Sequence, residues 1–343
     1  MKLIPCRIKS VSALFVLFWS LCSAILLGCQ SSTSDQRPEG SVTVKIPLFD
    51  GQNYKLGLVE LTTLEDLVNL RGAAANFLFS PSIQSGKLVG HSPKIRTMRT
   101  TDGTFVATDA SSLQLLSLYA HLETLMKWDE TLGTKGLNAW PRTVAVNTNI
   151  NHPTQGISRN NALYSGDLDA FLFVPYTQSD LPLSVNGGVI AHEHFHSFFY
   201  RIVLQPLRGR FSEARLSNPH DTSHLEGNLR SPGERGSNLE SARFTKRDLY
   251  HLALFRAMNE GLADVWGYLY SNDLRFVSRS LVQERMGRDL NLASTQLIES
   301  KTDWEEKIHP HILKNTKKMY ELGVKYARTL FRTLPENPEK KKK

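Results

Sequence analysis

The sequence predicts an α+β fold in two lobes, a β-rich lobe over residues 42–186 that contains one long helix and a helical lobe over residues 187–335. Two patterns carry this prediction. Apolar and polar residues alternate through much of residues 41–109, as in strands that are buried on one face. In the second half, apolar residues recur at helical spacing, and the helix predicted at residues 185–203 lies where the two lobes meet.

Residues 1–29 have the features of an export signal. Basic residues come first, an apolar run follows over residues 11–27, and the run ends in the letters LLGC at Cys29. The run is slightly short for a membrane-spanning helix, which needs about 20 apolar residues. Its end resembles the bacterial lipobox, which implies cleavage before Cys29 and acylation of its thiol, with membrane lipid as a partner. The alternative is a plain signal anchor with an incidental cysteine.

The composition agrees with an exported, lipid-anchored chain. Cleavage would remove Cys6 and Cys22, and acylation would use Cys29, so the mature chain would hold neither a free thiol nor a disulfide. Residues 29–41 are polar, contain Pro and Gly, and predict a flexible tether. Gln30 follows the anchor in place of Asp, which indicates the outer membrane if the source is Gram-negative. The formal charge of +8 is spread along the chain, so we expect no nucleic-acid partner.

The elements of the first lobe follow from the spacing of its apolar residues. Val42, Val44 and Ile46 alternate with polar residues and predict a strand. Leucines at helical spacing then predict a helix that stops at Gly133. The predicted elements of this lobe are strands within residues 41–109, a helix over 109–132, and strands over 143–149 and 170–176.

The second lobe is predicted to be helical over residues 185–203, 246–269 and 311–334. Between the first two of these helices, residues 205–241 form a polar stretch rich in Arg, Ser, Gly, Pro and Asn. Such long loops are uncommon in compact domains and are often functional or disordered. The basic tail over residues 336–343 is expected to be disordered.

His192 and His196 are four residues apart in the first of these helices. Two imidazoles one turn apart lie on the same face and can share one zinc ion at about 2.0–2.1 Å. Glu193 is rotated from His192 by about 100°, so it can act as general base on a zinc-bound water without binding the metal. The alternative is a surface helix, but the apolar residues around the motif predict burial. His194 lies on another face and is expected to be packed or hydrogen-bonded.

Glu260, within the letters NEGLADVWG, is the candidate for the third protein ligand that a catalytic zinc needs. Asp264 lies one turn later and could accept the second ring N–H of His192, which would fix its tautomer. Gly261 is expected to let the two metal-bearing helices approach closely. The alternative is a surface Glu/Asp pair, but the flanking apolar residues make a wholly exposed face unfavourable.

Together these motifs resemble those of the thermolysin-like (gluzincin) zinc peptidases, which share HExxH and a later NExxxD. Further likenesses are the letters NNALY at residues 160–164, GDLD at 166–169 and LPLS at 181–184, which resemble the family's edge strand, turn and the run before its zinc helix. The resemblance covers about residues 110–270. It implies a zincin-like two-lobed fold, and it implies that Asn161 and Ala162 hydrogen-bond the backbone of an extended peptide.

The sequence departs from the family pattern in two places. The insertion at residues 205–241 lengthens the gap between the two metal-binding motifs. The second departure concerns the donor that would stabilise the transition state, for which His309 in the letters IHPH fits best, His311 comes next, and Tyr250 is a further candidate. A plain loop histidine is the alternative for both. Calcium ions, which the family also binds, are possible here but have no assigned ligands.

We therefore expect a zinc-dependent endopeptidase, tethered through Cys29, that acts on peptide or protein substrates. One alternative is an inactive binding lipoprotein that keeps the zincin fold, but the intact Glu193 argues against it. The other is a zinc hydrolase of a non-peptide substrate, against which the edge strand at Asn161 argues mildly.

Overall fold

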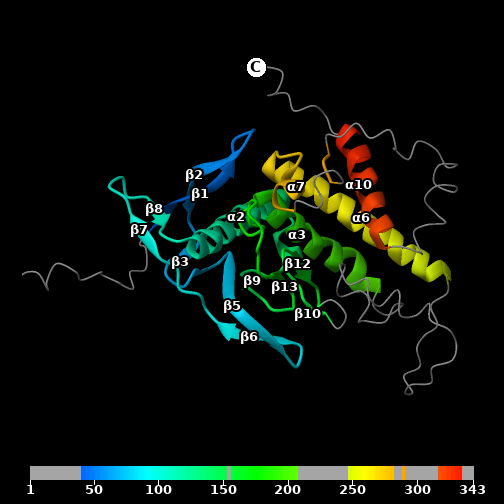
Figure 1. Cartoon of the computed structure of the whole chain (residues 1–343), viewed down its shortest axis with the longest axis horizontal. Coiled ribbons are helices and arrows are strands. Elements are labelled where there is room, and N and C mark those ends of the chain that lie inside the picture. Colours follow the sequence, from blue (N-terminus) through cyan, green and yellow to red (C-terminus); the bar gives the residue numbers. More distant parts are fainter. Residues whose placement is uncertain (1–39, 153–155, 208–245, 282–287, 291–315, 334–343) are drawn as a thin grey trace, which may run out of the picture. The chain divides into compact units, whose positions relative to one another are not determined.

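A computed structural model describes residues 40–152, 156–207, 246–281, 288–290 and 316–333 (Figure 1). All of these belong to one compact unit, residues 37–343. Several predictions fall outside the described residues. These are the export signal and Cys29, the tether up to residue 39, residues 208–241 of the insertion, His309, His311 and the basic tail.

The chain first forms a four-stranded sheet with the order β2-β1-β8-β7. Its strands are β1 (Val42–Phe49), β2 (Tyr54–Leu61), β7 (Thr97–Arg99) and β8 (Phe105–Ala107). Val42, Val44 and Ile46 are buried as their alternation predicted, because successive side chains of a strand point to opposite faces. β1 pairs antiparallel with β2 and parallel with β8. A two-stranded sheet of β3 (Leu64–Asp66) and β4 (Arg71–Gly72) follows β2.

The second large sheet has the order β12-β13-β9-β5-β6. Its strands are β5 (Ala75–Gln84), β6 (Lys87–His91), β9 (Arg142–Val146), β12 (Ala162–Ser165) and β13 (Ala170–Phe173). The three central strands are parallel, and both edge strands are antiparallel to their neighbours. β12 is therefore an edge strand, as the resemblance implied for residues 160–164. A short pair, β10 (Asn151–His152) and β11 (Gly156–Ile157), completes the strands of the described chain.

Helix α2 (Ala110–Leu132) confirms the long helix predicted in this half of the chain. It starts where the Asp109 carboxylate accepts the N–H of Ser112, and it ends at Gly133, whose φ of 73° suits glycine. Its buried leucines belong to one continuous apolar core that also includes residues of both large sheets and of the later helices. A single 3-10 turn, η1 (Lys135–Leu137), follows it.

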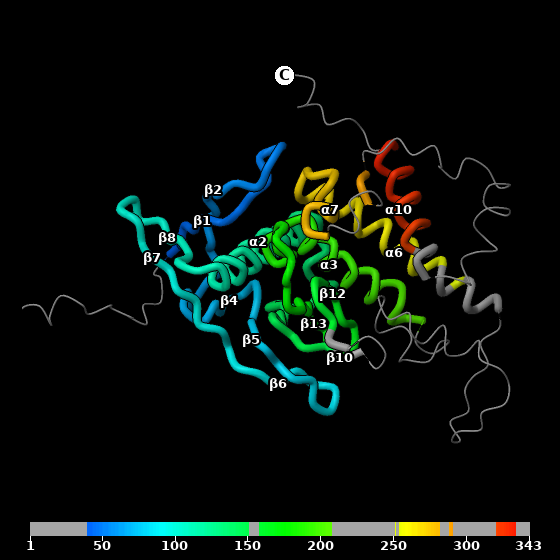
Figure 2. Tube along the Cα trace, viewed as in Figure 1, coloured from blue at the N-terminus to red at the C-terminus, as the bar shows by residue number. Residues whose placement is uncertain are grey.

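The C-terminal half is helical, as predicted (Figures 1 and 2). Its elements are α3 (Gly187–Phe199), the π-helical turn η2 (Tyr200–Leu204), η3 (Gln205–Leu207), α6 (Lys246–Ser271), α7 (Phe276–Ser280) and α10 (Thr316–Thr333). Helix α6 packs against both α3 and α10. The protein is thus a mixed α/β structure with sheets in the first half and helices in the second. Within the described residues, no helix is both long and apolar enough to cross a bilayer.

Candidate metal centre

Helix α3 carries both histidines of the motif and is buried at every residue except Phe195. It begins two residues later than the apolar pattern indicated, because Asn186 caps it. The Asn186 side chain accepts the backbone N–H groups of Gly188 and Val189 at 3.1 and 3.3 Å. These are two of the donors that a helix leaves unsatisfied at its first turn.

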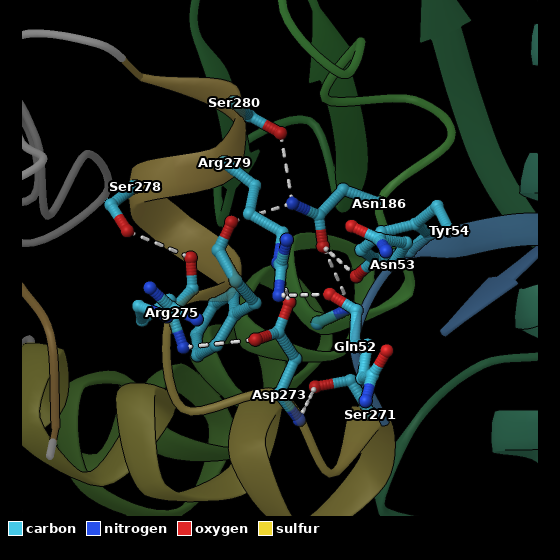
Figure 3. Close-up of polar contacts among 12 residues, drawn as sticks. Gln52, Asn53, Tyr54, Asn186, Ser271, Asp273, Arg275, Ser278, Arg279 and Ser280 are labelled. Atoms are coloured by element: carbon cyan, nitrogen blue, oxygen red, sulfur yellow. Dashed lines mark hydrogen bonds and ion pairs between the residues drawn. The ribbon is translucent and has the colours of Figure 1, made fainter. Parts of the chain in front are cut away.

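Asn186 also ties α3 to two other elements (Figure 3). Its Oδ1 accepts the hydroxyl of Tyr54 at 3.0 Å, which joins the β1–β2 hairpin to the helix. Its Nδ2 donates to the Phe276 carbonyl at 2.7 Å and to the Ser280 hydroxyl at 2.8 Å, both in α7. Arg279 of α7 lies over the Phe49 ring of the same hairpin. The start of α3 is therefore held from two sides.

Glycines set how closely α6 approaches its neighbours. A Cβ on Gly267 would lie 2.6 Å from the carbonyl oxygen of Gly188, so this pair allows α3 and α6 to cross. We expected Gly261 to serve that crossing, and this was wrong. A Cβ on Gly261 would instead lie 2.4 Å from the carbonyl oxygen of Gly323, so Gly261 admits α10. Sequence spacing could not distinguish the two partners of α6.

The helix crossing brings His192, His196 and Glu260 together in the interior. The two Nε2 atoms are 3.0 Å apart. Glu260 Oε2 lies 3.6 Å from His192 Nε2, and Glu260 Oε1 lies 3.6 Å from His196 Nε2. Tetrahedral ligands at about 2.0–2.1 Å from zinc are about 3.3 Å apart, so the separations suit one ion. All three side chains are buried and offer lone pairs to the same point, which makes the group a fit for a metal cation.

Glu193 lies at the same place. Ligand atoms of His192, Glu193 and His196 lie close enough together to form a possible metal site. The Glu260 carboxylate, however, has one oxygen 3.6 Å from each of the two histidine Nε2 atoms. Glu193 is the poorer candidate ligand of the two carboxylates, because its Oε2 already accepts the backbone N–H of Tyr164 at 2.9 Å. One oxygen of Glu193 is thus anchored to β12 while the carboxylate stays beside the histidines.

Asp264 and Arg288 surround this group with further charge. Asp264 Oδ1 is 3.1 Å from His192 Nδ1, a contact that lies off the line of an ideal hydrogen bond. Arg288 contacts Asp264 at 2.5 Å and Glu260 at 3.5 Å. Burial would lower the pKa of His192, but Asp264 and Glu260 raise it to about 9. Burial would raise the pKa of Asp264, yet Arg288 and His192 hold it below its usual value.

The edge strand β12 borders the centre and contains Ala162; Asn161 directly precedes it. Ala162 donates its backbone N–H to the Asn161 side chain at 3.0 Å, and Tyr164 donates its own to Glu193. These two amides therefore do not face β13. Residues two apart in a strand point their backbone groups the same way, so the carbonyls of Ala162 and Tyr164 also face the outer edge. That edge is where an added strand would pair.

His194 is fully buried, but it points away from the metal centre and contacts Asp129, as its place on another face of the helix predicted. Its Nε2 lies 3.1 Å from both carboxylate oxygens of Asp129 in α2.

In the GDLD turn, Asp169 contacts Arg201 at 2.5 Å and Arg142 at 3.6 Å. Among the described residues, the group around His192 is the only cluster of three potential metal ligands, so calcium is still without a site.

Comparison with known proteins adds no family. No family model matches the sequence, and no curated protein matches it. The functional argument therefore depends on the residues and their geometry. Sequence reasoning missed Arg288, because a single arginine in a polar stretch has neither motif nor periodicity. It also missed the role of Asn186, although an Asn directly before an apolar helix is a recognisable cap signal.

Proposed function

We propose that the protein is a zinc-dependent endopeptidase of the gluzincin type, with His192, His196 and Glu260 as metal ligands. One observation carries the proposal: the Glu193 carboxylate has an oxygen within 4.8 Å of ring nitrogens of both histidines, and it accepts the backbone N–H of Tyr164 in an edge strand. A base is thereby placed between a metal-binding group and an edge to which an extended peptide can add. A zincin-like arrangement of two lobes agrees with the sheets in the first half and the helices in the second.

The donor set favours zinc on chemical grounds. Two imidazoles and one carboxylate are the ligands of several catalytic zinc sites, which keep a fourth position for water or substrate. Zinc bound here would acidify a water and polarise the scissile carbonyl. Asp264 orients His192, and Arg288 beside Asp264 and Glu260 offsets part of their negative charge.

Glu193 performs the proton transfers in this proposal. Its carboxylate accepts a proton from the attacking water and delivers that proton to the leaving amine. The Tyr164 N–H holds one oxygen, which fixes the direction of the other. The outer edge of β12, with the carbonyls of Ala162 and Tyr164, holds the substrate backbone in an extended conformation, and Asn161 lies at the start of that edge.

Glu193→Gln tests the proposal directly. The variant is nearly isosteric and cannot take up a proton, so it should keep zinc and fold but lose at least the roughly 10²–10⁴-fold rate typical of general-base catalysis. His192→Ala should lose metal and hydrolysis together, and the exposed Glu130→Gln serves as a matched control that changes neither. Zinc content and hydrolysis of a peptide library are measured side by side. Near wild-type rates in Glu193→Gln would refute the mechanism, and a zinc-loaded wild type that cleaves nothing would favour a binding lipoprotein.

The proposal includes tethering through an acylated Cys29, which lies outside the described residues. Its support is the LLGC sequence after an apolar run. In a bacterial host, the wild type should incorporate labelled fatty acid and partition into detergent. Cys29→Ser should lose both properties. Equal processing and membrane retention of the variant would show that another feature anchors the chain.

A further inference from the structure

We infer that the outer face of the four-stranded sheet is a membrane-docking face, which rests on the bilayer to which the chain is tethered. It consists of Leu56, Leu58, Lys45, Val106 and Met98. The inference rests on the tethering through Cys29 that the proposed function includes. It adds a contact with lipid that the folded protein makes itself, and this contact decides which side of the molecule faces the membrane.

One row of side chains crosses all four strands of this sheet (Figure 1). Neighbouring strands lie about 4.8 Å apart, so the row is about 14 Å long. Leu56 lies two residues before Leu58 in β2 and shares its face, because side chains of a strand alternate between the two faces. The strand pairs set the members of the row in the order Leu58, Lys45, Val106 and Met98.

The docking face points away from the apolar core. Val44 precedes Lys45 in β1, points the other way and is fully buried in the core that α2 also lines. A sheet with one packed face is expected to carry polar side chains on the other. Here Leu56, Leu58 and Met98 are exposed by 56, 59 and 58%. Single exposed apolar residues are ordinary, but a group of them on one face indicates an interaction surface.

The docking face is bounded at both ends of the β1–β2 hairpin. Phe49 and Tyr54 belong to the same face by strand alternation, but Arg279 of α7 lies over both rings. At the other end, Glu60 follows Leu58 on the same face and is exposed. The apolar part therefore lies between the contact with α7 and a charged border.

The position of this sheet along the chain indicates the bilayer as its partner. β1 begins at Val42, so only residues 30–41 separate it from Cys29. A tether of that length reaches at most about 45 Å, and about 20 Å on average if it is flexible. Lys45 is the third residue after Val42, so the row lies about 10 Å from the point where the tether joins the fold. An acylated Cys29 would thus hold the docking face within reach of lipid.

The side chains of the docking face also suit a bilayer surface. Leucine and methionine enter the boundary between headgroups and acyl chains, as the apolar face of an interfacial helix does. Lys45 lies between Leu58 and Val106 in the row, and its stem can stay on apolar surface while its ammonium extends to lipid phosphates. A second copy of the chain on this face would instead bury that ammonium in an apolar interface, which is costly.

The test attaches the environment-sensitive dye NBD to the docking face and to a matched position elsewhere. Cleavage and acylation would leave the mature chain without a free thiol, so one engineered cysteine takes one label. Leu58→Cys and Met98→Cys probe the two ends of the row. Leu132→Cys is the control, because Leu132 is 55% exposed but lies at the end of α2, about 33 Å from the start of that helix beside β8.

The labelled, acylated proteins are reconstituted into vesicles of phosphatidylethanolamine and phosphatidylglycerol, with and without doxyl-labelled lipid as a quencher. We expect the probes at Leu58 and Met98 to show blue-shifted emission that doxyl lipid quenches, and the probe at Leu132 to keep the emission of an aqueous site. Adding Leu56→Ser to Leu58→Cys should reduce the quenching severalfold without a change in melting temperature, because it removes an apolar neighbour from an exposed position.

Three outcomes would overturn the docking face, and fatty-acid incorporation in the same samples separates them. Equal emission and quenching at all three positions of an acylated protein would refute it and leave the tether and the peptidase proposal standing. A blue shift at Leu58 without quenching by doxyl lipid would refute it in favour of a second copy of the chain. A protein that incorporates no fatty acid would refute the tether, and the docking face with it.

Discussion

The start and the centre of helix α3 both bury polar groups, but they bury different kinds. At the start of the helix, Asn186 exchanges hydrogen bonds with neutral partners, and each contact pairs a donor with an acceptor. About two to three turns later, His192 and His196 direct their Nε2 atoms at each other, with the Glu260 carboxylate against both. The first arrangement is complete within the protein. The second gathers lone pairs and negative charge, and a cation is the natural partner for such a group.

Two buried histidines show the same difference in their pKa values. His121 packs against the first residue of α3, and burial lowers its pKa to about 4. His192 is also buried, but Asp264 and Glu260 outweigh the burial effect and raise its pKa to about 9. Burial alone therefore favours a neutral imidazole, whereas neighbouring carboxylates favour the protonated one. We infer that the start of α3 holds the fold and that its centre is built for chemistry.

Asn186→Ala tests the first half of this contrast and should have the largest effect on stability. Loss of a helix cap costs about 1 kcal/mol, and each buried partner left without a hydrogen bond costs about 1–3 kcal/mol. With Tyr54, Phe276 and Ser280 all losing a partner, we expect the free energy of unfolding to fall by at least about 4 kcal/mol. Urea denaturation with a chelator present measures it.

Asp109→Ala is the matched control, because Asp109 caps α2 through a local contact, in which its side chain accepts the backbone N–H and the hydroxyl of Ser112. It should cost about 1 kcal/mol. The stability gained on adding zinc also distinguishes the Asn186 contacts from the group formed by His192, His196 and Glu260. Both the wild type and Asn186→Ala should gain about 4 kcal/mol at free zinc a thousand times Kd, whereas Glu260→Ala should gain little. Equal costs for the two cap variants, or a full zinc gain in Glu260→Ala, would remove the distinction between the clusters.

The sequence predicted well those features that depend on local order. The long helix was bounded correctly because Asp109 and Gly133 are strong end signals. The face of α3 that carries His192 and His196, and the separate placing of His194, followed from helical spacing alone. The edge position of β12 agreed with the motif at residues 160–164.

Features that depend on which helices and strands pack against each other could not be predicted from the sequence. Gly261 contacts α10 and not α3, and nothing local distinguishes these partners. Arg288 reaches Asp264 and Glu260 from a segment without a motif, so only the tertiary structure brings it to the centre. A site assembled from four separate segments is visible in sequence only where a segment repeats a known spacing.

A smaller prediction sharpens the contrast between the two histidines. The folded pKa of His121, about 4, lies below the ordinary value of 6.5, so acid protonates the unfolded chain first. Stability from the neutral imidazole is present above about pH 6.5 and is lost as pH falls toward about 4. At about 1.4 kcal/mol per pKa unit, the loss approaches about 3 kcal/mol. The Tyr270 hydroxyl lies 2.8 Å from His121 Nδ1, but it carries no charge that would raise the pKa of His121 above its ordinary value.

Unfolding of the metal-free protein is therefore measured from pH 7 to 4, so that release of metal by acid plays no part. His121→Gln should start less stable than the wild type at pH 7, because it disturbs a packed site, and the gap should narrow by about 2–3 kcal/mol toward pH 4, since glutamine does not titrate. The exposed His91→Gln should follow the wild-type curve in parallel. Other groups, such as His194, whose pKa burial also lowers, add to the acid loss in all three proteins and cancel in the differences. A constant gap between His121→Gln and the wild type would mean that His121 is not held neutral, and the start of α3 would then differ less from its centre than the geometry implies.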